Sequence, residues 1–341
     1  MEVPLIFPLL ALTPTRFDMN RTRRAAIAVA TLSLCCGAIL GATGLANAQD
    51  WPSRPVKFIV PLGPGSGTDI GARLMAEQLT RLWGQSVVVE NRIGGDGVVG
   101  INAFIAAHDS HTLLYMPTSS FVAHPYQHDK LPYDPAELSP VARITNTYVG
   151  LVLSPSLNAA TVADFIAAAR AQPGKLNYAT GTGMTDVQFE AYFKSEGLAL
   201  TRVSYRDVVT PMADLGEGRI QAYAGGLPIV QPHVQAGRAK LVAVTNSRRS
   251  ASHPDVPTVG EAGFPGLTFD GLVGIFGPRD LAAAARERIA TAIRTVLAEP
   301  AIASRLIGMG AGVIPGDGVE FAASIDEQRA KLAAVLGAKA R

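Results

Sequence analysis

Strand-like and helix-like runs alternate along most of this chain, and the alternation constrains its fold more than any other feature. Residues 56–60, 87–89 and 112–116 are short runs rich in aliphatic and β-branched side chains. Between them, residues 68–83 and a shorter segment through Ile101 and Ile105 repeat apolar side chains at helical spacing. Strands that alternate with helices predict an α/β fold built on a parallel sheet.

The same pattern returns after a short gap in the middle of the chain. Further strands are expected at 148–153, 176–179, 202–205, 220–224 and 240–244, helices at 161–170 and 188–195, and a mostly helical tail from residue 282. No linker separates the two α/β segments. We therefore predict two lobes crossed by more than one strand, with a ligand cleft between them at the carboxyl ends of strands.

The N-terminal segment has the features of an export signal. Arg21, Arg23 and Arg24 precede an apolar run over residues 25–45, which ends in Ala46-Asn47-Ala48. We expect cleavage after Ala48, so that residues 1–48 are a signal peptide, with Met19 as the true start and the product in the periplasm. A retained membrane anchor is the less favoured alternative, and the choice between general and twin-arginine export stays open.

Removing residues 1–48 changes the composition in an informative way. Both cysteines, Cys35 and Cys36, lie in that segment, so the remaining chain has no thiol or disulfide. Four of the 30 basic and two of the 28 acidic residues also lie there, which leaves 26 of each. This balance, with no basic stripe, argues against a nucleic-acid partner.

The loops that follow the expected strands are the candidate lining of the cleft. Residues 63–69 (Gly-Pro-Gly-Ser-Gly-Thr-Asp) join a strand to a helix, so glycines and free N–H groups favour an anion such as a carboxylate there. A plain capped turn is the alternative interpretation. Residues 118–120 (Thr-Ser-Ser) and 180–185 (Thr-Gly-Thr-Gly-Met-Thr) are two more loops dense in hydroxyls. Arg206, beside a fourth loop, can pair with a ligand carboxylate or with a surface acid such as Asp207.

Patterns of catalysis and metal binding are missing from the sequence. Ser66 lacks the spacing of a nucleophile elbow, and Asp69 has no identifiable catalytic partner. His124 and His128 are four residues apart, but Pro125 between them argues against a regular ligand helix, so we favour exposed loop histidines over a metal site. We predict no enzyme, no metal and no cofactor.

Several landmarks, taken together and in order, resemble one known family. Residues 51–56 (WPSRPV) resemble its opening "YP-x-[KR]-P[VI]", and residues 60–69 resemble its "P…GGGTD" loop. Residues 83–95 resemble "WGQxVVVENRPGAGG", and residues 131–135, 173–178 and 254–263 also match. The chain is identified as a member of the Bug, or tripartite tricarboxylate transporter, substrate-binding proteins.

This resemblance implies a type II periplasmic binding protein fold with two α/β lobes around a central ligand cleft. Residues 49–150 with 247–341 would form lobe 1, and residues 151–246 would form lobe 2. It also implies that loops from both lobes hold a carboxylate through N–H groups, hydroxyls and water. The ligand-binding residues expected by position are Gly65, Ser66, Gly67, Thr68, Asp69, Thr118, Ser119, Thr182, Gly183, Thr185, Tyr205 and Arg206.

Departures from the family pattern concern the pocket. The loop at 179–185 lacks the family's histidine, Asp207 replaces a glycine, and Gly225-Gly226 replaces a usually polar pair. Asp207 would weaken anion binding or favour a ligand with an amino group.

The resemblance implies capture of a small organic acid by a monomer that delivers it to membrane permease subunits. A sensor component that presents its ligand to a kinase, and an exported enzyme, are the alternatives.

Overall fold

The computed structural model describes residues 51–181 and 183–336. The predicted signal peptide, residues 1–48, therefore lies outside the described residues, as does Thr182. None of the helices in the described ranges has the length and apolar character needed to cross a bilayer.

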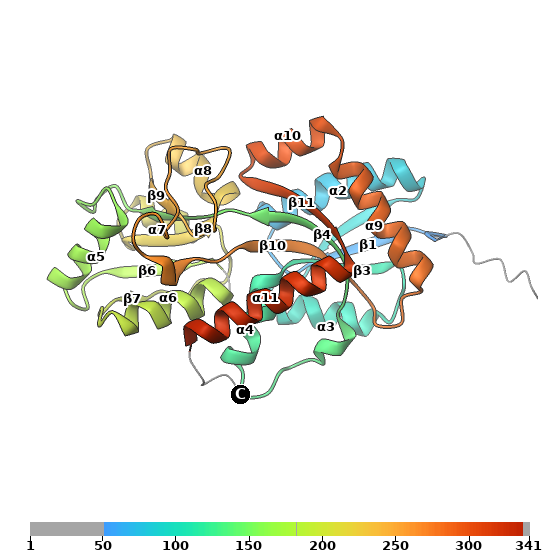
Figure 1. Cartoon of the computed structure of the whole chain (residues 1–341), viewed down its shortest axis with the longest axis horizontal. Coiled ribbons are helices and arrows are strands. Elements are labelled where there is room, and N and C mark those ends of the chain that lie inside the picture. Colours follow the sequence, from blue (N-terminus) through green and yellow to red (C-terminus); the bar gives the residue numbers. More distant parts are fainter. Residues whose placement is uncertain (1–50, 182, 337–341) are drawn as a thin grey trace, which may run out of the picture. The chain divides into compact units, whose positions relative to one another are not determined.

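A six-stranded mixed sheet is formed by strands from both ends of the described chain (Figure 1). Its strands, in spatial order, are β11 (Ala311–Asp317), β4 (Ser139–Thr147), β10 (Gly271–Gly277), β3 (Thr112–Pro117), β1 (Val56–Val60) and β2 (Val87–Asn91). β1 runs parallel to β2 and β3, whereas β10 is antiparallel to β3 and β4, and β11 is antiparallel to β4. The helices that accompany this sheet in the chain are α2 (Gly67–Trp83), α3 (Val98–Ala107), α4 (Thr118–Gln127), α9 (Ala283–Leu297), α10 (Pro300–Gly308) and α11 (Gly318–Leu336).

A five-stranded mixed sheet is formed by the middle of the chain. Its strands, in spatial order, are β7 (Thr201–Arg202), β6 (Asn177–Thr180), β8 (Ala222–Gly226), β5 (Val149–Leu153) and β9 (Lys240–Val244). β6 runs parallel to β7 and β8, and β5 is antiparallel to β8 and β9. The helices in the same stretch of chain are α5 (Val162–Ala171), α6 (Gly183–Ser195), α7 (Pro211–Gly216) and α8 (Leu227–Gln235).

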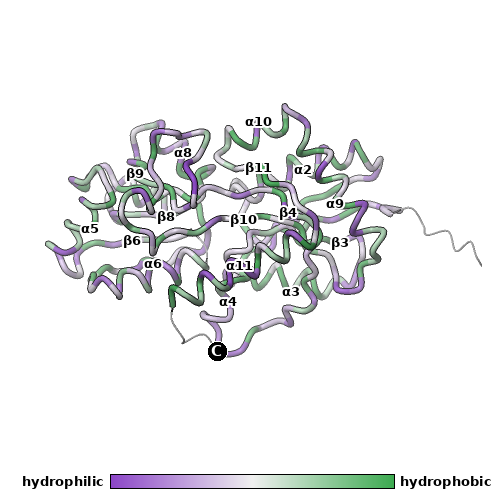
Figure 2. Tube along the Cα trace, viewed as in Figure 1, coloured by the Kyte–Doolittle hydropathy of each residue, from purple (hydrophilic) through white to green (hydrophobic). Residues whose placement is uncertain are grey.

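Helix α2 shows how the sequence sets these elements. The Ser66 hydroxyl accepts the Asp69 N–H at 3.2 Å as N-cap, and Gly84 ends the helix at a left-handed φ of 65°. Leu74, Met75 and Leu79 are buried, and each contributes about 1.5–3 kcal/mol of transfer free energy. Figure 2 shows the resulting mixture of hydrophobic and hydrophilic residues along the helices, as one face of each packs inward.

The α/β organisation predicted from the sequence is confirmed, but several elements differ. The sheets are mixed, not parallel, because β4, β5, β10 and β11 run against their neighbours. β4 and β10 were not expected, and β11 interrupts a tail predicted to be mostly helical. The strand predicted at 202–205 is reduced to Thr201–Arg202, and the supposed loop at 118–120 is the first turn of α4.

Two connections join the sheets, one between β4 and β5 and one between β9 and β10. Three polar side chains bond to one another where these connections meet. Asn146 Nδ2 donates to Asp270 Oδ1 at 2.8 Å, and Asn246 Nδ2 donates to Asn146 Oδ1 at 3.0 Å. The Asn246 side chain is fully buried, so this network fixes the two connections relative to each other.

Candidate ligand site

A small cavity of about 60 Å³ lies between segments of the two sheets. Its lining residues are mainly small, hydroxylated or aliphatic: Leu62, Ser66, Gly67, Thr68, Pro117, Ser119, Thr147, Val149, Gly181, Thr185, Val208, Ala224, Gly225, Gly226, Ile229, Phe269 and Gly271. None of these lining residues has an ionisable carboxyl, amino, guanidinium or imidazole group. By the usual allowance of about 10–15 Å³ per water, the cavity has room for about five water molecules.

Four helices begin at the wall of this cavity. Gly67 and Thr68 start α2, Pro117 and Ser119 flank the start of α4, Thr185 is in the first turn of α6, and Gly226 is the N-cap of α8. Each helix N-terminus carries unpaired N–H groups and a partial positive charge. The cavity therefore favours an anion even though its lining has no cationic side chain.

The first glycine loop contributes part of its expected set. Ser66, Gly67 and Thr68 line the cavity, and the Thr68 hydroxyl forms no hydrogen bond with another described residue. Gly65 is exposed and lies outside the lining. Its N–H instead donates to Asp69 Oδ2 at 3.0 Å.

Asp69 also lies outside the cavity lining. Its carboxylate accepts from Asn91 Nδ2 at 2.9 Å and pairs with Arg73 at 3.0 Å. Burial alone would raise the pKa of Asp69, but bonds from Arg73, Asn91 and the Gly65 N–H outweigh burial and lower it. Asp69 thus braces the glycine loop through these bonds.

The start of α4 places its two expected residues in different environments. Ser119 lines the cavity, whereas Thr118 is fully buried and donates its hydroxyl to Gln328 Oε1 at 2.5 Å. Gln328, a buried residue of α11, also donates from Nε2 to the Asp270 carbonyl at 2.5 Å. The Thr118 side chain therefore links α4 to α11.

We expect Gln328→Leu to lower the free energy of unfolding by about 2 kcal/mol, because the partly buried Asp270 carbonyl loses its donor and the buried Thr118 hydroxyl loses its Gln328 acceptor. Denaturant unfolding measures this change. Gln172→Leu, at an exposed position after α5, should stay within about 0.5 kcal/mol of the unsubstituted protein. An equally small change for Gln328→Leu would contradict a bridging role.

The start of α6 contributes Gly181 and Thr185 to the lining. Gly183 is buried beside it, where a side chain would overlap Asp96 Oδ2. The helix begins five residues earlier than the sequence predicted, at Gly183 instead of residue 188. Its first turn is therefore part of the site.

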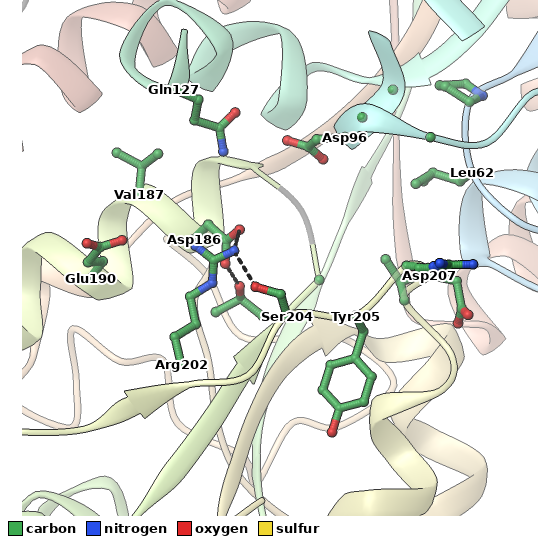
Figure 3. A pocket seen from close by; sticks show the side chains of 18 of the residues that line it. Leu62, Asp96, Gln127, Asp186, Val187, Glu190, Arg202, Ser204, Tyr205 and Asp207 are labelled. Carbon is green, nitrogen blue, oxygen red and sulfur yellow. Dashed lines mark hydrogen bonds and ion pairs between the residues drawn. The ribbon is translucent and has the colours of Figure 1, made fainter. Parts of the chain in front are cut away.

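A second, wider pocket of about 1030 Å³ adjoins the cavity. Leu62, Gly181 and Val208 line both spaces, so the cavity and the pocket lie side by side at these three residues. Figure 3 shows the wider pocket, with Asp96 and Gln127 on one side and Asp186, Arg202 and Ser204 on another. Arg202 pairs with Asp186 at 3.2 Å.

Tyr205 and Arg206 line this wider pocket instead of the cavity. The Tyr205 hydroxyl donates to Asp214 at 2.6 Å, and its ring points away from Asp96 in Figure 3. Arg206 is exposed and does not pair with Asp207 within the described chain. Asp207 instead accepts from the Val209 and Thr210 N–H groups, each at 2.8 Å, so it caps its own loop.

The histidines differ from the expected exposed loop residues. His124 is fully buried inside α4, which runs on through Pro125. Its Nδ1 accepts from the Tyr133 hydroxyl at 2.7 Å while Nε2 donates to the Asp96 carbonyl at 3.0 Å. In the described ranges, no three histidine, cysteine or acidic side chains come together as a metal site.

Much of the cavity wall was not expected from the sequence. Thr147 and Val149 lie at one connection between the sheets, Phe269 and Gly271 lie at the other, and Gly225 and Gly226 end β8. Thr147 and Gly271 belong to β4 and β10, which were not predicted. Val149, Gly225 and Gly226 belong to β5 and β8, which were predicted as strands but not as part of the site. The one available signal was Gly226, recognised as a departure from the family pattern.

Comparison with known proteins shows which family the chain matches. The model of the tripartite tricarboxylate transporter family receptor matches residues 71–340. The chain is 33% identical over 288 residues to a UPF0065 protein of Bordetella bronchiseptica, covering 83% of this chain and 85% of that protein. It is 30% identical over 269 residues to protein BugT of Bordetella pertussis, covering 76% and 80%.

Among solved structures, an R. palustris protein determined with adipate superposes with a TM-score of 0.78. The two chains are 28% identical, and the match covers 84% of this chain and 99% of the other. The two-lobe binding fold predicted from the sequence is confirmed by this likeness.

Proposed function

Because this chain belongs to the tripartite tricarboxylate transporter family receptors, we propose that it captures a small organic acid in the cavity between its two sheets. The observation that carries the proposal is the convergence of four helix N-termini on a cavity without ionisable lining side chains. A carboxylate there would accept N–H and hydroxyl donors from Thr68, Ser119 and Thr185. Hydrogen bonds to a charged acceptor contribute about 1.5–3 kcal/mol each, enough for useful affinity from a few contacts.

The proposed size of the ligand rests on the two adjoining spaces. The cavity accommodates a carboxylate and a few further atoms, and the remainder of a ligand passes Gly181 into the wider pocket. The structurally similar R. palustris protein was solved with adipate, a six-carbon diacid, which supports a small aliphatic acid as the ligand class. Of the expected ligand residues, we retain Ser66, Gly67, Thr68, Ser119 and Thr185 as direct contacts, with Arg206 at the rim.

We place the hinge at the two connections that carry Asn146, Asn246 and Asp270. Lobe 1 then comprises residues 49–150 and 247–341, and lobe 2 comprises residues 151–246. Closure of these lobes over a bound acid brings the α2 and α4 termini of one against the α6 and α8 termini of the other. Residues 1–48 serve as the removable signal, and the product acts in the periplasm.

The partners we propose are the permease subunits of a tripartite tricarboxylate-type transporter. A sensor kinase that reads the closed form is the second candidate. Enzymatic turnover is disfavoured, because the carboxylate of Asp69 is already engaged by Arg73, Asn91 and the Gly65 N–H.

A melting-shift screen over aliphatic, amino and aromatic acids tests the proposal. Binding to the folded state adds about 2.7 kcal/mol at a ligand concentration 100 times Kd, which raises Tm by about 5 °C or more. Sugars and divalent metals serve as negative controls. If no acid raises Tm but a sugar or a metal does, the carboxylate function is wrong.

A further inference from the structure

Asp96, in the connection between β2 and α3, lies against the first residue of α6. The space beside Gly183 is filled by Asp96 Oδ2 and by the Ala123 methyl, so no side chain fits there. Ser120 donates its hydroxyl to Asp96 Oδ1 at 2.9 Å. A carboxylate from the segment that follows β2 therefore already stands at the N-terminus of α6, where free N–H groups and the helix dipole attract an anion.

The negative charge of Asp96 is met by neutral hydrogen-bond donors from Ser120, Gly183 and Gln127. Oδ2 is enclosed and accepts no hydrogen bond of ordinary geometry from the described residues. Burial raises the pKa of Asp96 to about 6, and the charge of Asp186 adds to the rise, whereas hydrogen bonding from Ser120, the Gly183 N–H and Gln127 opposes it. The group is therefore mostly ionised at pH 7.5.

The charged and titratable groups around Asp96 do not supply a cation. From α4, His124 Nε2 lies 3.9 Å from Oδ2, but burial lowers the pKa of His124, and His128 packs on its other side. From α6, Asp186 is already paired with Arg202. Asp96 therefore forms no ion pair with a lysine or arginine of the described residues, although Lys194, Arg202 and Arg206 also line the wider pocket.

The backbone at Asp96 supports a specific role for this side chain. Its φ is 50°, in the left-handed region that favours glycine. Aligned letter by letter with "WGQxVVVENRPGAGG", Asp96 stands where the motif has glycine. A side chain held in an unfavourable conformation at the rim of a binding pocket points to a functional reason for its presence.

We propose that Asp96 acts as a built-in anion at the start of α6 and selects acids with one carboxylate over dicarboxylates. The proposal rests on the proposed function, since it presumes that the first carboxylate occupies the cavity. The far end of the ligand then passes Gly181 and meets Asp96 and Asp186 on the pocket wall. A second carboxylate is repelled there, whereas a methyl, hydroxyl or amino end is accepted.

Matched acids that differ only at the far end test this selectivity. We would titrate butanoate against succinate, pentanoate against glutarate, and hexanoate against adipate by calorimetry at pH 7.5. For the unsubstituted protein we expect at least one monocarboxylate to bind about ten-fold or more tightly than its diacid partner. In Asp96→Asn and Asp96→Gly, the ratio of monocarboxylate affinity to diacid affinity should fall by about ten-fold, mainly because the diacid binds better.

Asp280→Asn removes an exposed acid that lines neither space and should leave the ratio unchanged. The proposal would be overturned if, in all three pairs, the diacid bound the unsubstituted protein as tightly as its partner. A ratio unaffected by both Asp96 substitutions, or failure of all three monocarboxylates to bind, would also overturn it. The proposed function fails separately, only if no acid of the wider screen binds.

Discussion

Thr68→Glu is expected to abolish the binding of carboxylates, with a loss of at least about 100-fold in affinity. The Thr68 hydroxyl faces the cavity and has no partner among the described residues, so a longer acidic side chain would place its carboxylate where the ligand's belongs. Two unit charges about 4 Å apart at an effective dielectric constant of about 20 repel by about 4 kcal/mol. The fold should tolerate the change, because an acid in the first turn of α2 favours the helix dipole.

Thr68→Gln separates charge from bulk, because glutamine has the shape of glutamate without its charge. We expect it to weaken binding far less than Thr68→Glu does, while Thr295→Val, an exposed threonine on α9, leaves affinity unchanged. Calorimetric titration with the best acid from the melting-shift screen gives the three affinities. Equal affinities for Thr68→Glu and the unsubstituted protein would show that the ligand binds elsewhere.

The local elements of the six-stranded sheet were largely predictable, because their signals are local. β1 was predicted with both of its ends correct, and α2 was predicted to within one residue. Ser66 caps α2 and Gly84 ends it, as residue type alone suggests. Hydroxyl-rich loops after strands likewise pointed to Ser66, Thr68, Ser119 and Thr185, which line one cavity in the structure.

Strand β10 (GLVGIFG) was not predicted, because glycines interrupt its apolar residues and isolated glycines are a signal for turns. Gly271, Gly274 and Gly277 are glycines for a tertiary reason. A side chain at any of them would overlap Thr147, Phe321 or Leu281, which pack against the strand. Because β10 was missed, so were the antiparallel pairing with β4 and the cavity residues Phe269 and Gly271 next to its start.

Side-chain direction in the loops also depends on partners that are remote in sequence. Thr118 turns toward Gln328, which is 210 residues away, while its neighbour Ser119 faces the cavity. Asp69 is held by Arg73 and Asn91. The sequence motifs do not distinguish these residues from one another. Only the tertiary contacts show which side chains line the cavity and which are held by other parts of the protein.

Asp96→Asn is expected to stabilise the protein at neutral pH and to have a smaller effect in acid. The folded state raises the pKa of Asp96 from 3.8 to about 6, with burial as the largest cause. The folded protein therefore binds a proton more readily than the unfolded chain, and stability falls as pH rises from about 4 to about 6. A pKa shift of this size corresponds to about 3 kcal/mol of unfolding free energy. The 27% exposure of the side chain and the α6 dipole reduce the expected gain to about 1–2 kcal/mol.

Denaturant unfolding of both proteins at pH 4, 5, 6 and 7.5 measures this difference, in the absence of ligand. The difference should be smallest near pH 4, where Asp96 is protonated in the folded state and only partly ionised in the unfolded chain. It should grow to about 1–2 kcal/mol at pH 7.5, with Asp96→Asn the more stable. Asp280→Asn should follow the unsubstituted protein throughout. If Asp96→Asn is instead less stable at pH 7.5, the ionised carboxylate stabilises α6 by more than its burial costs. The Asp96 carboxylate would then stabilise the folded protein as well as repel a second ligand carboxylate.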